Sequence, residues 1–254
     1  MRNHPRIIAA IVFCVIAIGM TALAGLRGSQ ESNGQDKGQK KSQKMIEAES
    51  RLPVADYGAA EPTDPKEREK RIKKGKKYEK PEYADLTIND SSEVVTTFSH
   101  WASGLSATPT DRSATIIVGN VTEARAFISP GKIRVYSEFR VDVSEVLKDD
   151  ADSSIKCGSS LVIDRIGGRV QFANGNVGQY WISGQGMPRV GGRYLLFLTK
   201  PDADAGYSIL TGYELRDGHV YLLDNPGAGH PITTREGTDE ASLLNEVRAA
   251  VSGN

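Results

Sequence analysis

The chain has 254 residues and no net formal charge, with 32 Lys and Arg against 32 Asp and Glu. The charge is unevenly distributed, because residues 25–81 carry 15 Lys and Arg against 10 Asp and Glu, whereas residues 82–254 carry 15 against 22. Residues 82–254, the longer of the two parts, are therefore acidic. An acidic surface argues against nucleic-acid binding. We therefore expect no nucleic-acid partner.

The N-terminal segment is typical of an exported protein. Residues 7–26 hold no charged side chain, follow Arg2 and Arg6, and end with small residues at Ala22 and Ala24. This order fits a signal peptide cleaved after Ala24. It also fits a retained single-pass anchor, because twenty helical residues span about 30 Å. Both interpretations predict an extracytoplasmic protein that is membrane-anchored, periplasmic or secreted.

The two cysteines exclude an internal disulfide in the exported part. Cys14 lies in the apolar segment, so Cys157 has no partner in the rest of the chain. We expect Cys157 to be buried, as most free cysteines are.

Composition predicts three regions: a signal peptide or anchor over 1–26, a disordered charged linker over 27–84, and a β-barrel domain over 85–254. Gly28 to Lys44 contains no apolar residue and cannot offset the entropy of ordering. The charge run at 66–77 has two interpretations, a solvated stretch of linker or a contact with anionic headgroups or an acidic wall polymer.

Helices are predicted at both ends of the domain. Asp90 and Glu93 have the spacing of a capping box, and apolar residues follow up to Trp101, which predicts a helix over 91–102. Thr238 can cap a second helix, over about 238–252, whose apolar residues recur at helical spacing.

Between these helices the apolar residues alternate with polar ones, as in strands. Ile116 and Val118 mark a first strand, and residues 133–143 alternate over a longer second one. Further strands are predicted at 160–166, 169–172, 193–199, 207–213 and 219–223, separated by glycine turns. This pattern predicts a mainly β fold, an antiparallel barrel or sandwich, with its core at about 112–223.

Three blocks within this core support a family resemblance. They are Ala114-Thr115-Ile116-Ile117-Val118-Gly119-Asn120-Val121, the strand end Val146-Leu147-Lys148, and Val190-Gly191-Gly192-Arg193-Tyr194-Leu195-Leu196-Phe197-Leu198. Their order resembles the netrin-like modules, the tissue inhibitors of metalloproteinases and, more closely, uncharacterised exported bacterial proteins. The resemblance covers residues 112–223 and implies a five-stranded barrel of OB type. Those inhibitors chelate zinc through an N-terminal cysteine that this chain lacks, so no site residue is transferred.

A search for catalytic or metal-binding motifs finds no matching pattern. The four histidines lack a second His or Cys at ligand spacing, so no metal site is predicted. Ser183 lacks the flanking glycines of a nucleophile elbow, and no phosphate-binding loop occurs. We therefore expect a non-enzymatic protein without a cofactor.

The segment from Tyr180 to Arg193 is a candidate contact surface. It combines Tyr180, Trp181, Gln185 and Arg189 with several glycines, and OB barrels bind ligands through loops and a sheet face. The alternative is that the aromatic residues close the barrel and the glycines turn the chain.

We accordingly expect an envelope protein that binds an unknown protein or envelope polymer, and the membrane through residues 7–26 if these are not cleaved. One alternative is an extracellular protease inhibitor of netrin-like fold, suggested only by the resemblance. A second is a hydrolase that the motifs do not reveal.

Overall fold

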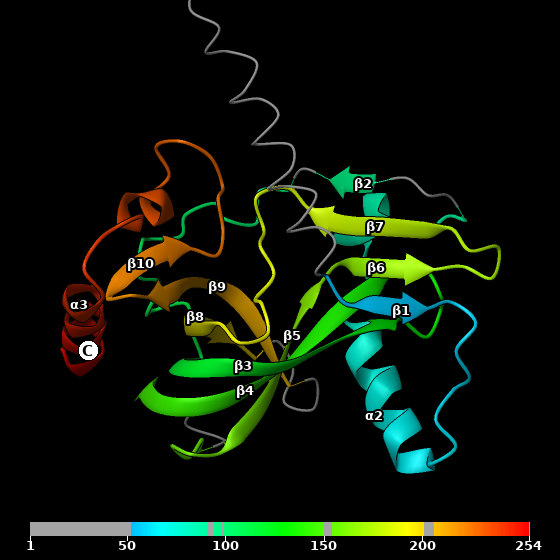
Figure 1. Cartoon of the computed structure of the whole chain (residues 1–254), viewed down its shortest axis with the longest axis horizontal. Coiled ribbons are helices and arrows are strands. Elements are labelled where there is room, and N and C mark those ends of the chain that lie inside the picture. The colour runs from blue at the N-terminus through cyan, green and yellow to red at the C-terminus, as the bar shows by residue number, and fades with distance from the viewer. Residues whose placement is uncertain (1–51, 91–93, 98, 150–153, 201–205, 254) are drawn as a thin grey trace, which may run out of the picture. The chain divides into compact units, whose positions relative to one another are not determined.

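The computed structural model describes residues 52–90, 94–97, 99–149, 154–200 and 206–253, which belong to one compact unit. The export segment and the first part of the predicted linker lie outside the described residues. Within them the fold is mixed α/β with more strand than helix, and its strands form a six-stranded and a four-stranded sheet (Figure 1).

The six-stranded sheet nearly closes into a ring. Its strands are β3 (Thr115–Ile128), β4 (Val135–Lys148), β5 (Ser160–Ile166), β8 (Arg193–Thr199), β9 (Tyr207–Arg216) and β10 (His219–Leu222). The order is β10-β9-β5-β4-β3-β8, and β8 also pairs with β9. The pairs are antiparallel except for a short parallel contact between β5 and β9.

Irregularities in β3 help to curve the sheet. Its pairing with β4 shifts register at three places between Ile116 and Glu123, and such bulges bend and twist a strand. Gly119 lies at one shift, where an added Cβ would lie 2.7 Å from the backbone oxygen of Asp142. The two backbones therefore approach each other more closely than any side chain would allow.

The four-stranded sheet is mixed. Its order is β1 (Val54–Asp56), β6 (Gly168–Gln171), β7 (Val177–Ile182), β2 (Val94–Thr97). The hairpin β6–β7 is antiparallel, and the short edge strands β1 and β2 each run parallel to their neighbour. The sheet rests on the far ends of β3 and β4, since Ala126 and Val135 share a core cluster with Val170 and Tyr180.

Four helical segments accompany the sheets. They are α2 (Pro65–Lys76), the 3-10 helices η1 (Pro81–Leu86) and η2 (Pro231–Arg235), and α3 (Glu240–Ser252). Helix α3 confirms the predicted C-terminal helix, although its N-cap is Asp239, which accepts a hydrogen bond from Ser242 N at 2.8 Å, and not Thr238.

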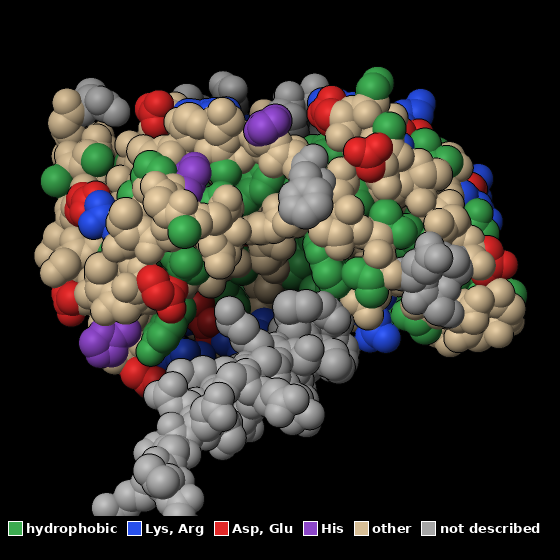
Figure 2. Space-filling view, turned by 90° about the horizontal axis from the view of Figure 1, so that it is seen from above, with side chains coloured by type: hydrophobic (Ala, Val, Ile, Leu, Met, Phe, Trp, Pro, Cys, Tyr) green, Lys and Arg blue, Asp and Glu red, His purple; other side chains and the backbone are tan. Residues whose placement is uncertain are grey.

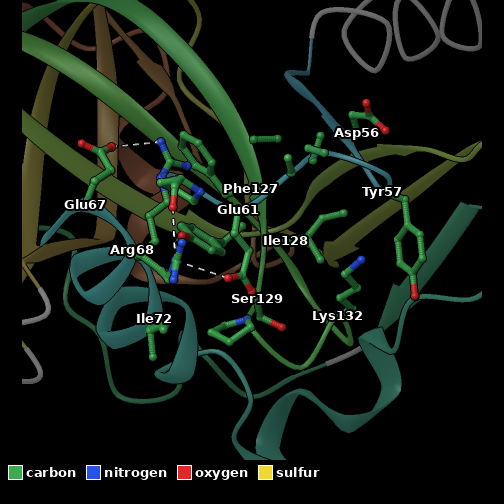
Figure 3. A pocket seen from close by; sticks show the side chains of 18 of the residues that line it. Asp56, Tyr57, Glu61, Glu67, Arg68, Ile72, Phe127, Ile128, Ser129 and Lys132 are labelled. Carbon is green, nitrogen blue, oxygen red and sulfur yellow. Dashed lines mark hydrogen bonds and ion pairs between the residues drawn. The ribbon is translucent and has the colours of Figure 1, made fainter. Parts of the chain in front are cut away.

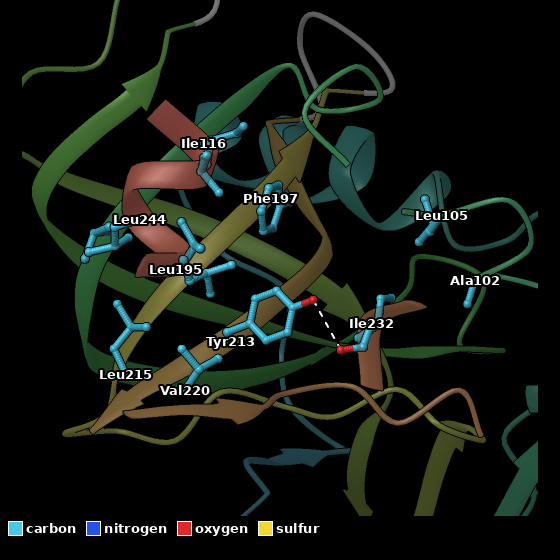
Figure 4. Packing of buried hydrophobic residues seen from close by; sticks show 13 residues of the cluster. Ala102, Leu105, Ile116, Leu195, Phe197, Tyr213, Leu215, Val220, Ile232 and Leu244 are labelled. Carbon is cyan, nitrogen blue, oxygen red and sulfur yellow. Dashed lines mark hydrogen bonds between the residues drawn. The ribbon is translucent and has the colours of Figure 1, made fainter. Parts of the chain in front are cut away.

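Two core clusters cover the two faces of the ring. One has members from β3, β4, β5, β8 and β9, the five strands whose pairing closes the ring, and so fills its interior, with Phe139, Ile163 and Leu196 fully buried. The other packs the outer face of β8 and β9 against η2 and α3, around Phe197 and Tyr213 (Figure 4). Strand β8 is thus buried on both faces, which explains its nearly unbroken apolar sequence.

The predicted alternation along β4 is confirmed over Phe139 to Ser144 but is wrong before Phe139. There Arg134 and Tyr136 were expected to face water, yet they are 4% and 1% exposed. Tyr136 stacks on Tyr78 at 5.1 Å between ring centroids, so the chain after α2 covers the second face of this strand.

Three other predictions are wrong. Residues 52–84 of the predicted disordered linker form β1, α2 and η1. The predicted helix over 91–102 contains strand β2, because Val94, Val95, Thr96 and Thr97 favour extended backbone and pair with β7. Cys157 is exposed, and its thiol donates to Ser144 O at 2.9 Å.

The face opposite α2 is mixed in character. Seen from the top of Figure 1, hydrophobic side chains gather in its middle and charged ones are scattered around them (Figure 2). A hollow of about 540 Å³ lies elsewhere, beside α2.

Candidate functional site: a cleft beside helix α2

The structure separates the four residues that the sequence suggested as a contact surface. Tyr180 is fully buried on β7, and its hydroxyl donates to Asn89 O at 2.9 Å. It therefore belongs to the core and cannot meet a partner. Trp181, the next residue of β7, is half-buried and pairs with Thr96 of the edge strand β2.

The other two predicted residues line different hollows. Gln185 lies in a hollow of about 300 Å³ that also contains Trp101 and Ser208. Arg189 lies in one of about 480 Å³ and forms an ion pair with Glu214 at 2.5 Å. Because the four side chains do not converge, the segment does not form one site. A binding role for Trp181, Gln185 and Arg189 stays a prediction.

A larger cleft lies between α2, the 57–64 loop, β1 and the end of β3 (Figure 3). We call it the helix cleft. It encloses about 540 Å³, within the range of small-molecule and peptide sites. It is built by residues between 55 and 72 and by residues between 126 and 136, more than fifty positions further along the chain, so no short motif could reveal it.

The walls of the helix cleft are mostly apolar, whereas its rim is charged. Wall residues include Ala55, Tyr57, Ile72, Phe127 and Ile128. The rim carries both signs, in Asp56, Glu61, Asp64, Glu67, Arg68, Arg71 and Lys132. An apolar interior with a few polar groups at its edge is typical of a binding site, because burial supplies affinity and the polar groups orient the ligand.

Ion pairs hold the loop and the helix on either side of the cleft. Arg68 Nε lies 3.5 Å from Glu61 Oε2 and donates to Pro62 O at 3.1 Å, which ties the loop to α2. Arg71 pairs with Glu67 at 3.2 Å, and its guanidinium lies 4.1 Å from the ring centroid of Phe127. Arg71 therefore joins the helix to β3.

Local sequence explains why α2 begins at Pro65. Asp64 accepts a hydrogen bond from Lys66 N at 3.0 Å, and Pro65 occupies the first turn, where it has no hydrogen bond to lose. Lys73, Lys74 and Lys76 in the last turn suit the negative end of the helix dipole.

A buried polar network anchors the end of α2 on the ring. Lys77 Nζ donates to both oxygens of Asp164, at 2.7 and 2.8 Å, and to Ser208 Oγ at 3.0 Å. The Tyr78 hydroxyl also donates to Asp164, at 2.5 Å, and Lys74 pairs with Glu138 at 2.9 Å. Asp164 is fully buried, so these contacts neutralise a carboxylate that could not stay there alone.

Burial shifts the pKa values within this network. It lowers the pKa of Lys77 below its ordinary value, although the charge and hydrogen bonds of Asp164 oppose the shift. It raises the pKa of Tyr78 well above its ordinary value, and the neighbouring carboxylate adds to this because it disfavours a second negative charge.

The network contains a serine beside a lysine, yet its hydrogen bonds do not activate the serine. The Ser208 hydroxyl donates to Asp164 Oδ1 at 2.9 Å, while Lys77 donates to the serine oxygen. A serine activated by a lysine needs a neutral amine that accepts its proton, and here Lys77 donates; Asp164, which accepts the serine hydrogen, already accepts hydrogen bonds from Lys77 and Tyr78. The arrangement supports a structural role for Ser208.

Among the described residues no three His, Cys, Asp or Glu side chains gather in a way that could hold a metal ion. The helices of the described part are also too short or too polar to cross a membrane.

No protein-family model fits the chain, and the comparison with curated proteins finds no match.

Proposed function

We propose that the chain is an exported or membrane-anchored envelope protein whose folded part is a non-enzymatic binding module, and that the helix cleft receives its partner. The observation that carries the proposal is the cleft itself, with apolar walls and a charged rim. The export signature of residues 7–26 supports the location.

We further propose that the ring is a barrel of OB type, as the resemblance to netrin-like modules implies. The cyclic pairing β3-β4-β5-β9-β8 supports this, because five strands that return to the first form a small Greek-key barrel. In that fold, ligands bind through loops and one face of the sheet. The helix cleft combines the 57–64 loop with the end of β3, a strand of the ring.

A photocrosslinking residue placed at Tyr57 tests the site in intact cells. Tyr57 is half-buried in the cleft wall, so a reactive group there should capture whatever enters. We expect a discrete adduct, and we expect Ala60→Trp to abolish it, because the exposed Ala60 lines the cleft and an indole would fill it.

The matched control is Ala241→Trp, at an exposed alanine on α3 that does not line the cleft. It should leave the adduct unchanged. An adduct that survives Ala60→Trp, or no adduct in an envelope fraction that holds the folded protein, would refute the cleft as the binding site.

A further inference from the structure

Helix α2 turns a row of lysines outward. Lys66, Lys70, Lys73 and Lys76 are all exposed, and spacings of three and four residues place them on one side of a helix. Glu69 is the acidic residue within this row and lies 3.4 Å from Lys73. Within the described part, no ion pair links Lys66, Lys70 or Lys76 to a carboxylate.

The row continues into a second hollow, on the other side of the contact between Arg71 and Phe127. This hollow measures about 260 Å³ and is lined by Lys70, Lys74, Arg125 and Arg140, among others. Glu123 pairs with both of the last two, and Glu138 pairs with Lys74. We call the exposed cations of helix and hollow the basic surface; they are Lys66, Lys70, Lys73, Lys76, Arg125 and Arg140.

The helix that carries most of the basic surface is fixed firmly to the rest of the domain. Lys77 is anchored on Asp164, and an added Cβ at Gly75 would lie 2.6 Å from Pro130 Cδ, so the helix sits tightly on the domain. A row of cations on such a fixed helix loses little conformational freedom when it meets a charged surface.

We propose that the basic surface docks on a bilayer that contains anionic phospholipid headgroups. The inference rests on the export part of the proposed function. Charge complementarity supports it, because the exposed row is cationic although residues 82–254 carry 15 Lys and Arg against 22 Asp and Glu. An acidic domain would be repelled by an anionic bilayer at most other orientations, so the charge distribution selects this face.

The length of chain before the described part also fits. If residues 7–26 are kept as an anchor, the 25 residues of 27–51 connect it to the domain. A chain of 25 residues reaches at most about 80–90 Å, so an anchor would keep the domain within that distance of the bilayer. The charges of the helix act once they come within about 8 Å of the bilayer at physiological salt.

The contact would be electrostatic and peripheral. Ile72 is the apolar side chain of α2, and it faces the helix cleft and not the lysine row. A surface without exposed apolar groups attracts headgroups but does not insert, so its attachment should vanish at high salt.

Lysine acetylation of the full chain in lipid nanodiscs provides a direct test. We expect the rates at Lys70 and Lys73 to fall about fivefold or more when phosphatidylglycerol is added to phosphatidylcholine, the factor expected for one cation near an anionic surface. Exposed Lys132 and Lys156 should react equally in both discs. At high salt the difference should disappear. Equal rates at Lys70 and Lys73 in both discs at physiological salt would overturn the proposal.

Amide exchange of α2 in the same discs allows variants to be compared. Phosphatidylglycerol in the discs should slow the amide exchange of α2. Replacement of the four lysines of the row by glutamine should abolish this protection, and replacement by arginine should keep it. The matched control removes four exposed cations elsewhere, by Arg112→Gln, Lys156→Gln, Arg216→Gln and Arg248→Gln. Protection that survives the glutamine variant, or that the control loses equally, would refute the basic surface.

Two further outcomes are informative. Protection by soluble polyphosphate but not by the discs would overturn the proposal in favour of a soluble polyanion. If the glutamine variant still forms the adduct at Tyr57, the helix cleft binds its partner without the basic surface. Failure of the membrane proposal would then leave the cleft proposal intact.

Discussion

Replacement of Asp164 by asparagine should remove most of the stability that the α2 anchor provides. Asp164 is fully buried and accepts hydrogen bonds from Lys77, Tyr78 and Ser208. Asparagine keeps the shape but removes the charge that faces the Lys77 ammonium, which is 3% exposed. Loss of one partner of a buried ion pair destabilises a protein by about 3–5 kcal/mol.

That loss is large beside the ~5–15 kcal/mol by which domains are usually stable. Urea unfolding of the full chain at neutral pH measures it, and amide exchange shows whether α2 opens alone or with the ring. The exposed Asp217→Asn, whose side chain is 85% exposed in the wild type, is the control and should change stability by less than about 0.5 kcal/mol.

A second variant tests whether the lost stability comes from the unpaired charge or from a change in the shape of the site. Lys77→Met combined with Asp164→Leu removes both charges, and such a replacement of a buried pair is often neutral or stabilising. We expect it to recover most of the lost stability. A loss of less than about 1 kcal/mol for Asp164→Asn, or a double variant no more stable than the single one, would refute the reasoning.

Three further predictions concern the folded part. Burial raises the pKa values of Tyr78, Tyr136 and Tyr213, so the folded state keeps these protons when the unfolded chain loses them. Their contribution is complete below pH ~10 and is lost above it, by about 1.4 kcal/mol per tyrosine per pH unit. The lowered pKa of Lys77 acts oppositely and at lower pH, because its effect ends once the unfolded lysine loses its proton near 10.5; urea unfolding above that pH should show a net loss of stability, and a flat profile there would contradict it. Gly186→Ala should prevent folding, because its Cβ would lie 1.8 Å from Leu223 O, and a normal circular dichroism spectrum would count against this. Asp239→Ala removes the N-cap of α3 and should reduce stability by about 1 kcal/mol in the same urea assay, whereas an unchanged midpoint would show that the cap is dispensable.

Strand positions in the ring were predictable from the sequence because apolar residues alternate with polar ones along the strands or, in β8, form a nearly unbroken run. Neighbouring residues alone produce these patterns. Residues 160–166 and 193–199 were predicted with the bounds that the structure shows. The sequence also indicated the start of β3 and the helix α3, since alternation and a helical apolar stripe survive whatever tertiary contacts follow.

The helix cleft could not be predicted because the sequence signal of α2 is misleading. A segment with seven Lys and Arg and one large apolar residue reads as a solvated linker. Its buried face consists of Lys74, Gly75 and the residues that follow, and these fit the ring only because Asp164 and Glu138 lie opposite. Asp164 belongs to a strand about ninety residues away, so no local pattern could reveal the pairing.

The sequence by itself thus determined the export signature, the alternating strands and the uneven charge, because each depends on neighbouring residues and on the polarity of their side chains. Tertiary structure alone decided that a charged segment becomes an ordered helix, that Tyr180 is core, and that residues 94–97 extend as an edge strand. The first two outcomes depend on counter-charges and packing partners that distant parts of the chain supply, and the third depends on the edge of β7, with which residues 94–97 pair.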